Sequence, residues 1–259
     1  MEKRLYNKKK YIEKAVAIAA ALLVWQIAAT VMNQTILLAA PIEVIQALGA
    51  VMLQKGFLGT IGFSFAHIVY GFLIGLGVGT LCAMLSARFH LVEILLWPYM
   101  AVIKATPVAS FIILCLVWLN ARNLSIFICF LIVVPVVYTN LLNGIRSMDP
   151  KMDEMARLYG FSHRTKFLAV SLPQLRPYIF SAFEISIGMA WKAGIAAEVI
   201  GVPAGSIGKM LYNAKIYLAT PELFAWTVII VVISVVFEKA AVGLLKFGYQ
   251  RLEHILWVL

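Results

Sequence analysis

Residues 124–143 read LSIFICFLIVVPVVYTNLLN, and none of the 20 side chains in this stretch carries a charge. An α-helix of about 20 apolar residues is long enough to cross the hydrocarbon core of a bilayer. A helix also bonds its own backbone N–H and C=O groups, which a segment surrounded by lipid requires. The stretch therefore predicts a transmembrane helix.

Five further segments have a similar length and apolar character: 15–33, 63–86, 94–119, 178–200 and 223–245. The segment at 94–119 contains Pro98 and Pro107, which we expect to kink it. Over the whole chain, 63% of the 259 residues are hydrophobic and 13% are charged, with a mean hydropathy of +0.92. A soluble domain contains about 25% charged residues. The predicted fold class is therefore an all-α membrane protein with about six transmembrane helices.

The basic residues are distributed unevenly over the connections between these segments. The basic tail at 1–14, the loop at 144–177 and the C-terminal end would share one side of the membrane. The opposite side would hold only Lys55, Arg122, Lys209 and Lys215. Basic residues collect on the cytoplasmic side of membrane proteins, so both termini are predicted to be cytoplasmic. The net charge of +10 then requires no nucleic-acid partner.

The first apolar segment follows a basic tail, as the core of a secretory signal peptide also does. It is longer than the roughly 7–15 residues of such a core, so we interpret it as a retained helix. The chain is then a cytoplasmic tail, 1–14, followed by a single transmembrane domain, 15–259. Residues 41–55 are expected to form a short amphipathic helix outside the membrane, and 144–177 is the longest internal loop.

That loop contains the sequence SMDPKMDEMARLYG at 147–160. Asp149 is a good N-cap, and Pro150 suits the first position of a helix. Gly160 supplies a residue that tolerates the left-handed conformation and ends the helix. The helix would carry an apolar stripe made of Met152, Met155, Ala156 and Tyr159. Such a stripe is typical both of a docking surface and of a helix that packs under its own bundle, so the residues alone leave both open.

A second helix is expected directly afterwards. Ser162 can cap a helix over 163–172, and Pro173 would mark its boundary with the next element. The loop would then consist of two short helices joined by an elbow at Gly160 and Phe161.

Here the chain resembles the permease subunits of binding-protein-dependent ABC importers. Their loop signature is Glu-Ala-Ala, three residues, Gly, nine residues, Ile, one residue, Leu-Pro. This chain matches it with Glu154-Met155-Ala156, Gly160, Val170, Leu172 and Pro173, and departs from it mildly at Met155 and Val170. The segments Pro41-Ile-Glu-Val-Ile, Ala190-Trp191 to Glu198 and Gly205-Ser-Ile-Gly208 resemble the nitrate, sulfonate and taurine branch.

The resemblance implies a type I ABC importer permease-like bundle in a bacterial cytoplasmic membrane. The first loop helix would be the coupling helix, which docks onto a separate ATP-binding subunit. The residues implied in this ATPase coupling are Met152, Glu154, Met155, Ala156, Tyr159, Gly160, Phe161, Leu172 and Pro173. ATP and Mg would be bound by that partner, so this chain itself would hold no cofactor. A second permease copy or paralogue and an extracytoplasmic substrate-binding protein are the other implied partners.

Four charged residues fall within or near the predicted spans: Lys104, Glu184, Lys192 and Glu198. Charges are costly in lipid, so these side chains should face protein or a water-filled cavity. Lys104, Trp191, Lys192 and Glu198 are the candidates for a translocation pathway, with structural pairing or interfacial anchoring as the other interpretation. If both lysines face the cavity, a small polar or anionic substrate would suit the pathway electrostatically.

No catalytic group and no metal site is predicted. The four histidines are scattered, no nucleophile lies near a base, and Gly208-Lys209 lacks the Ser or Thr of a phosphate-binding loop. The chain is therefore not expected to be an enzyme by itself. The alternative function is an ion-coupled secondary transporter, in which the intramembrane charges would be coupling sites, and a membrane enzyme or structural subunit is a third possibility.

Overall fold

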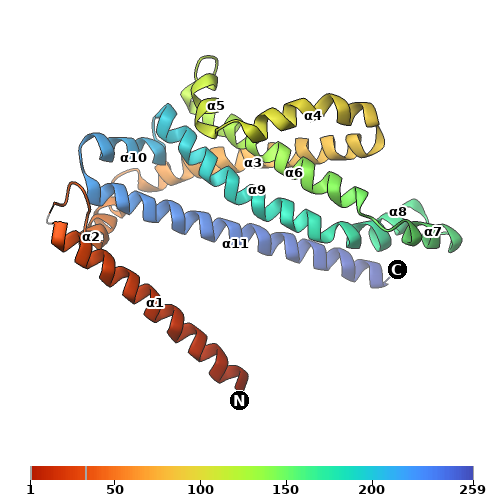
Figure 1. Ribbon diagram of the computed structural model, residues 1–259, viewed down its shortest axis with the longest axis horizontal. Coiled ribbons are helices and arrows are strands. Elements are labelled where there is room, and N and C mark those ends of the chain that lie inside the picture. Colours follow the sequence, from red (N-terminus) through yellow and green to blue (C-terminus); the bar gives the residue numbers. More distant parts are fainter. Residues whose placement is uncertain (1, 33, 259) are drawn as a thin grey trace. The chain divides into compact units, whose positions relative to one another are not determined.

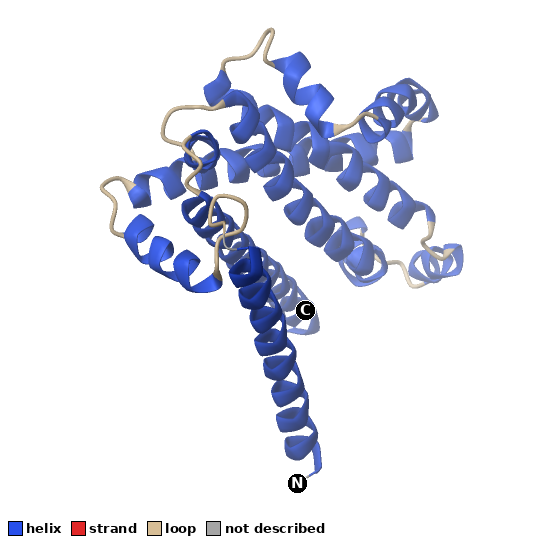
Figure 2. Cartoon of the chain, turned by 60° about the vertical axis from the view of Figure 1, so that its left-hand side comes forward, coloured by secondary structure: helices blue, strands red, loops and turns tan. Residues whose placement is uncertain are grey.

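The computed structural model describes the backbone of residues 2–32 and 34–258 and the side chains of 12–32 and 34–251. All regular structure in these ranges is helical (Figure 2). The elements are α1 (Glu2–Met32), α2 (Pro41–Met52), α3 (Phe57–Arg88), α4 (His90–Ala105), α5 (Val108–Cys115), α6 (Ala121–Arg146), α7 (Pro150–Leu158), α8 (His163–Lys166), η1 (Phe167–Ser171), α9 (Leu172–Gly201), α10 (Ile207–Ile216) and α11 (Thr220–Val258). Within the described ranges, five helices are long and apolar enough to cross a membrane, or six if the bent pair α4 and α5 is one span. This confirms the predicted fold class.

The helices form two compact units. The first comprises Met1–Gly59 and Met210–Ile230, and the second comprises Thr60–Lys209 and Val231–Leu259. The single transmembrane domain expected over 15–259 stays a prediction.

In the first unit, α1 and the turn that follows it are held to the beginning of α11. The rings of Trp25 and Phe224 lie 5.5 Å apart, and the Thr220 hydroxyl donates to the carbonyl oxygen of Ile36 at 2.6 Å. Helix α2 begins at Pro41, and its first turn is closed by Glu43, whose carboxylate accepts from the Ala40 N–H at 2.9 Å. The short helix expected at 41–55 is thus confirmed.

In the second unit, α6 and α9 run side by side and form the core (Figure 1). Large side chains of α6, such as Leu124 and Ile128, pack against Ala193 and Ala197 of α9. In lipid the hydrophobic effect does not drive helices together. Their association depends instead on close van der Waals packing, which small residues such as alanine allow.

Helix α3 reaches α6 through a line of glycines. A Cβ atom at Gly71 would collide with the carbonyl oxygen of Ile126, and one at Gly75 would lie 2.7 Å from the Cβ of Val133. Gly79 approaches Val137 in the same way. The three glycines therefore pack against α6 of the same chain, and none of them has room for a side chain.

The expected span at 94–119 is broken rather than kinked. Helices α4 and α5 meet at an angle of 105° across Thr106 and Pro107. The residue before a proline is forced out of the helical region, and Thr106 is extended, with φ −83° and ψ 131°. Pro98, by contrast, lies inside α4 without ending it.

Candidate functional site

Helix α7 forms for the reasons that its sequence indicates. The Asp149 side chain accepts from the N–H of Lys151 at 2.9 Å, and Pro150 occupies the first turn. At the other end Gly160 has φ +68°, and the N–H of Phe161 donates to the Ala156 carbonyl at 2.9 Å. The helix predicted between Asp149 and Gly160 is confirmed.

The outer face of α7 is apolar and differs from the predicted stripe. Leu158 is 87% exposed, and Met152, Met155 and Tyr159 are exposed as well. Ala156 is 0% exposed and faces inward. Sequence periodicity identifies which residues share a face of a helix, but not whether that face is exposed. For this reason the predicted stripe includes the buried Ala156 and omits the exposed Leu158.

Asp153 forms two ion pairs, one within α7 and one to α8. Asp153 pairs with Arg157 at 3.1 Å and with Lys166 of α8. The hydrogen bond from Lys166, then the nearby charges, lowers the pKa of the Asp153 carboxyl below its ordinary value. Glu154 is exposed and forms no ion pair with another described side chain.

The segment after α7 is continuous helix rather than a second short helix with an end. Ser162 caps α8 by accepting from the Thr165 N–H at 3.2 Å, as predicted. The chain then passes through the π-helical turn η1 and enters α9 without a break. A helix boundary was expected at Pro173. The structure shows only a change from π-helix to α-helix near Leu172, and Pro173 is accommodated because proline is tolerated in the first turn of a helix.

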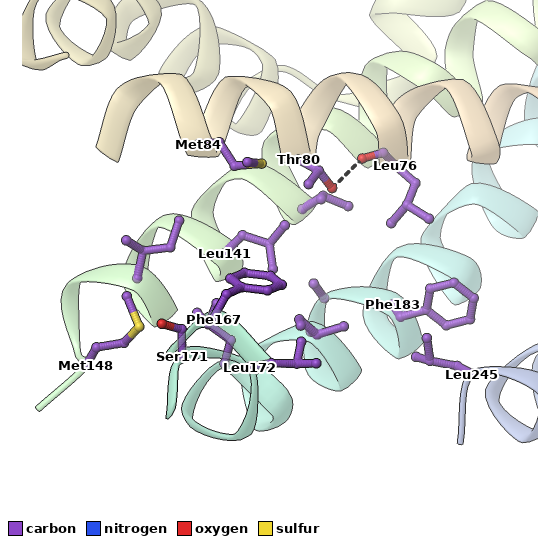
Figure 3. Close-up of a pocket in the computed structure, with 15 residues that line it drawn as sticks. Leu76, Thr80, Met84, Leu141, Met148, Phe167, Ser171, Leu172, Phe183 and Leu245 are labelled. Carbon is purple, nitrogen blue, oxygen red and sulfur yellow. Dashed lines mark hydrogen bonds between the residues drawn. The ribbon is translucent and has the colours of Figure 1, made fainter. Parts of the chain in front are cut away.

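An apolar cavity of about 430 Å³ lies beneath this junction, inside the second unit. Figure 3 shows the Phe167 ring of η1 beside Leu141 of α6, with Met84 and Thr80 of α3 across the cavity. The Thr80 hydroxyl donates to the Leu76 carbonyl at 2.7 Å, so it offers the cavity no free donor. The cavity is lined by Leu76, Thr80, Met84, Val137, Leu141, Ile145, Met148, Phe167, Ser171, Leu172, Leu175, Ile179, Ala182, Phe183 and Leu245.

The two lysines of the predicted pathway are both exposed at membrane-spanning helices. Lys104 lies in the last turn of α4 and donates to the Thr139 hydroxyl of α6. Lys192 lies on α9, and Glu184 is exposed two turns before it. None of these three charges forms an ion pair with another described residue. Trp191 faces the other way and is 2% exposed, beside Phe237.

Glu198 lies at the other end of α9 and is completely buried. Its Oε2 accepts from the Ser64 hydroxyl at 2.6 Å and from the Gly208 N–H at 3.2 Å. The Ser64 oxygen in turn accepts from the N–H of Ile207 at 2.9 Å. Sequence reasoning found Glu198 but missed Ser64, which lies 134 residues away with no local signal.

In the part of the chain that the structure describes, no group of three His, Cys, Asp or Glu side chains could hold a metal ion. Within those ranges, the candidate site consists of α7, the turn η1 that leads into α9, and the exposed charges on α4 and α9. The absence of a cofactor in this chain stays a prediction.

Comparisons with known proteins bear on what this arrangement does. Residues 71–252 match the family described as binding-protein-dependent transport system inner membrane component. The aliphatic sulfonates transport permease protein SsuC of Bacillus subtilis is 28% identical over 219 residues, 83% of this chain and 79% of that protein. The nitrate import permease protein NrtB of Synechococcus elongatus is 24% identical and covers 80% of this chain and 77% of its own length.

Two further likenesses are shorter or more distant. The bicarbonate transport system permease protein CmpB of Synechococcus elongatus is 30% identical over 156 residues, 59% of this chain and 52% of that protein. A crystal structure of an amino acid ABC transporter with histidines superimposes with a TM-score of 0.51 at 24% identity, over 75% of this chain and 91% of that one. The latter supports the fold alone.

Proposed function

The chain belongs to the family of binding-protein-dependent transport system inner membrane components, and on that premise we propose how it works. It is a multi-pass permease subunit of an ABC importer. In our proposal, α7 docks onto a separate ATPase subunit, which binds ATP and Mg and hydrolyses the nucleotide. Both termini and the loop at 144–177 then lie in the cytoplasm.

The exposed apolar face of α7 is the observation that carries this proposal. Leu158 and Tyr159 are among the most exposed large side chains of the described residues, and they sit on a helix flanked by charges. Exposed apolar patches with a polar rim mark protein interaction sites. Gly160 and Phe161 hold the end of this helix, while Leu172 and Pro173 begin the helix that enters the membrane.

The proposed mechanism is alternating access. ATP binding closes the two ATPase subunits, α7 moves with them, and the bundle opens toward an extracytoplasmic binding protein. Hydrolysis and release reset the bundle. A second permease subunit, identical or paralogous, completes the pathway.

For the substrate we propose a small anionic solute. Aliphatic sulfonates, nitrate and bicarbonate, named for the relatives, are all anions. Lys104 and Lys192 carry positive charge at exposed positions of spanning helices, and such charges face protein or water rather than lipid. Replacing both lysines by alanine should abolish anion uptake, and normal uptake by the Lys104→Ala, Lys192→Ala variant would remove this assignment. Trp191 and Glu198 are buried in the described conformation. In our proposal they therefore support the residues that line the pathway and do not line it themselves.

The docking proposal is tested by co-purification of the chain with its candidate ATPase. Leu158→Asp places a charge on the docking face and should lower the recovered complex at least about tenfold, as the loss of a central interface residue does. Leu53 is 88% exposed on the loop after α2, so Leu53→Asp is the matched control and should leave the complex unchanged. Equal recovery of both variants would contradict docking by α7. Transport driven by an ion gradient without any ATPase would favour the secondary-transporter alternative.

A further inference from the structure

Ala156 and Val170 are buried at the junction between α7 and α9, and two cavities lie next to that junction. The apolar cavity beneath it takes Phe167, Ser171 and Leu172 as part of its wall. A second cavity of about 360 Å³ separates α7 from the junction and is lined by Asp149, Pro150, Asp153, Glu154, Arg157, Val170, Ser171 and Gln174, together with Met148. Tightly packed interiors transmit displacement, whereas a segment beside an empty space can yield to it. A polar contact adds to the buried side chains that connect the two helices.

Gln174 makes that contact. Its Oε1 accepts from the backbone N–H of Asp149 at 2.8 Å, and its Nε2 donates to the Val170 carbonyl at 3.2 Å. Asp149 is the residue that caps α7, Val170 belongs to η1, and Gln174 lies in the first turn of α9. A single side chain thus joins the start of α7 to the start of the membrane-spanning helix.

The remaining polar connection is of a different kind. Asp153 and Lys166 join α7 to α8, and both side chains are partly exposed. Water and salt screen such a pair, which therefore contributes little to a fixed geometry. The amide of Gln174 carries no charge and is only half-buried, but it bonds to α7 at Asp149 while its bond to Val170 holds it against its own helix.

We propose that Gln174 is the positioning residue that makes α7 and α9 move as one body. A displacement of α7 by the ATPase then reaches the transmembrane bundle through this amide as well as through the buried side chains of Ala156 and Val170. The inference rests on the docking of α7 proposed above, and it assigns the transmission step to a residue outside the loop signature.

The test measures two distances by spin labelling in the reconstituted complex with its ATPase. One label pair, Lys151→Cys and Ile185→Cys, joins α7 to α9, and the other, Tyr70→Cys and Ile185→Cys, joins α3 to α9; all three sites are exposed. Cys82 is replaced by alanine because it is partly exposed, whereas Cys115 and Cys129 are buried. The ligands added are ATP and vanadate, so no transported solute is needed.

With Gln174 intact, ATP and vanadate should shift the α3–α9 distance and leave the α7–α9 distance unchanged. In Gln174→Leu the α7–α9 distance should change instead, and the shifted α3–α9 population should fall roughly 3- to 10-fold, as expected for the loss of one or two ordinary hydrogen bonds. Gln174→Glu keeps the acceptor for Asp149 and should retain most of the shift. Gln54→Leu, at an exposed position after α2, is the matched control and should behave as the wild type.

An unchanged α3–α9 shift in Gln174→Leu would overturn the proposal. If that variant is poorly folded, the α3–α9 shift is measured in Gln174→Asn instead. The shorter asparagine keeps the amide but should not reach both Asp149 and Val170, so the shift should fall in this variant too. Recovery of the ATPase with each variant is measured first. A wild-type chain that recovers no ATPase contradicts docking itself, whereas a variant that recovers the ATPase and moves normally contradicts only the role of Gln174.

Discussion

The two ends of α9 are secured in opposite ways. At its first turn, Gln174 contacts Asp149, the N-cap of α7, through a hydrogen bond that water can reach, next to two cavities. At its last turn, Glu198 is buried and bonded to Ser64 and Gly208. Polar contacts gain strength when water is excluded. The comparison indicates a helix with one adaptable end, where we propose that the ATPase acts, and one fixed end, which holds the bundle together.

The largest expected effect is at the fixed end. Glu198→Ala removes the Oε2 acceptor of two buried hydrogen bonds together with Oε1, which has no partner among the described residues, so it should lower the free energy of unfolding by about 1–2 kcal/mol. Thermal unfolding of the purified protein in detergent measures this. Glu184→Ala, an exposed carboxylate on the same helix, is the control and should change stability by less than about 0.5 kcal/mol. Equal effects of the two variants would remove the distinction between the ends.

A smaller effect is expected where α7 stops. Gly160 has φ +68°, a conformation that costs an alanine about 1 kcal/mol. Gly160→Ala should therefore leave global unfolding nearly unchanged while it weakens ATPase recovery about fivefold, the factor to which this strain corresponds. Gly188→Ala is the matched control, because Gly188 lies inside α9 with open space around it. Full ATPase recovery by Gly160→Ala would show that α7 tolerates a different end.

The smallest effect concerns pH. The hydrogen bond from Lys166 lowers the folded-state pKa of Asp153, so the pair contributes stability above the ordinary pKa of about 3.9. That contribution is lost as the pH falls through the lowered folded-state value. Thermal unfolding between pH 7 and pH 3 should thus show a slightly smaller decline for Lys166→Met than for the wild type. Identical profiles would mean that the pair does not hold α7.

The same comparison shows how far the sequence could be interpreted. The ends of α7 were predictable because a cap, a proline and a glycine act within a few residues of each other. The partners of Glu198 were not, because Ser64 is joined to it only by the fold. Gln174 was also missed, since a glutamine after Leu172-Pro173 carries no local signal of its long-range bond to Asp149.

The transmembrane spans divide in the same manner. Apolar length predicted α3, α6, α9 and α11 because lipid imposes a minimum helix length. The break between α4 and α5 was underestimated, because a proline within a span can either bend or end the helix according to its neighbours. Pro98 and Pro107 illustrate the two outcomes within ten residues.

The glycines of α3 have a consequence for how this chain can vary. Because Gly71, Gly75 and Gly79 leave no space against α6, those two helices cannot slip past each other by even one residue. Helices α3 and α6 must therefore move as one rigid body in any opening of the bundle. A saturation screen of α3 should accordingly reject every substitution at these three positions, yet accept alanine at Gly62 and Gly77, where a Cβ atom would meet nothing within 4 Å.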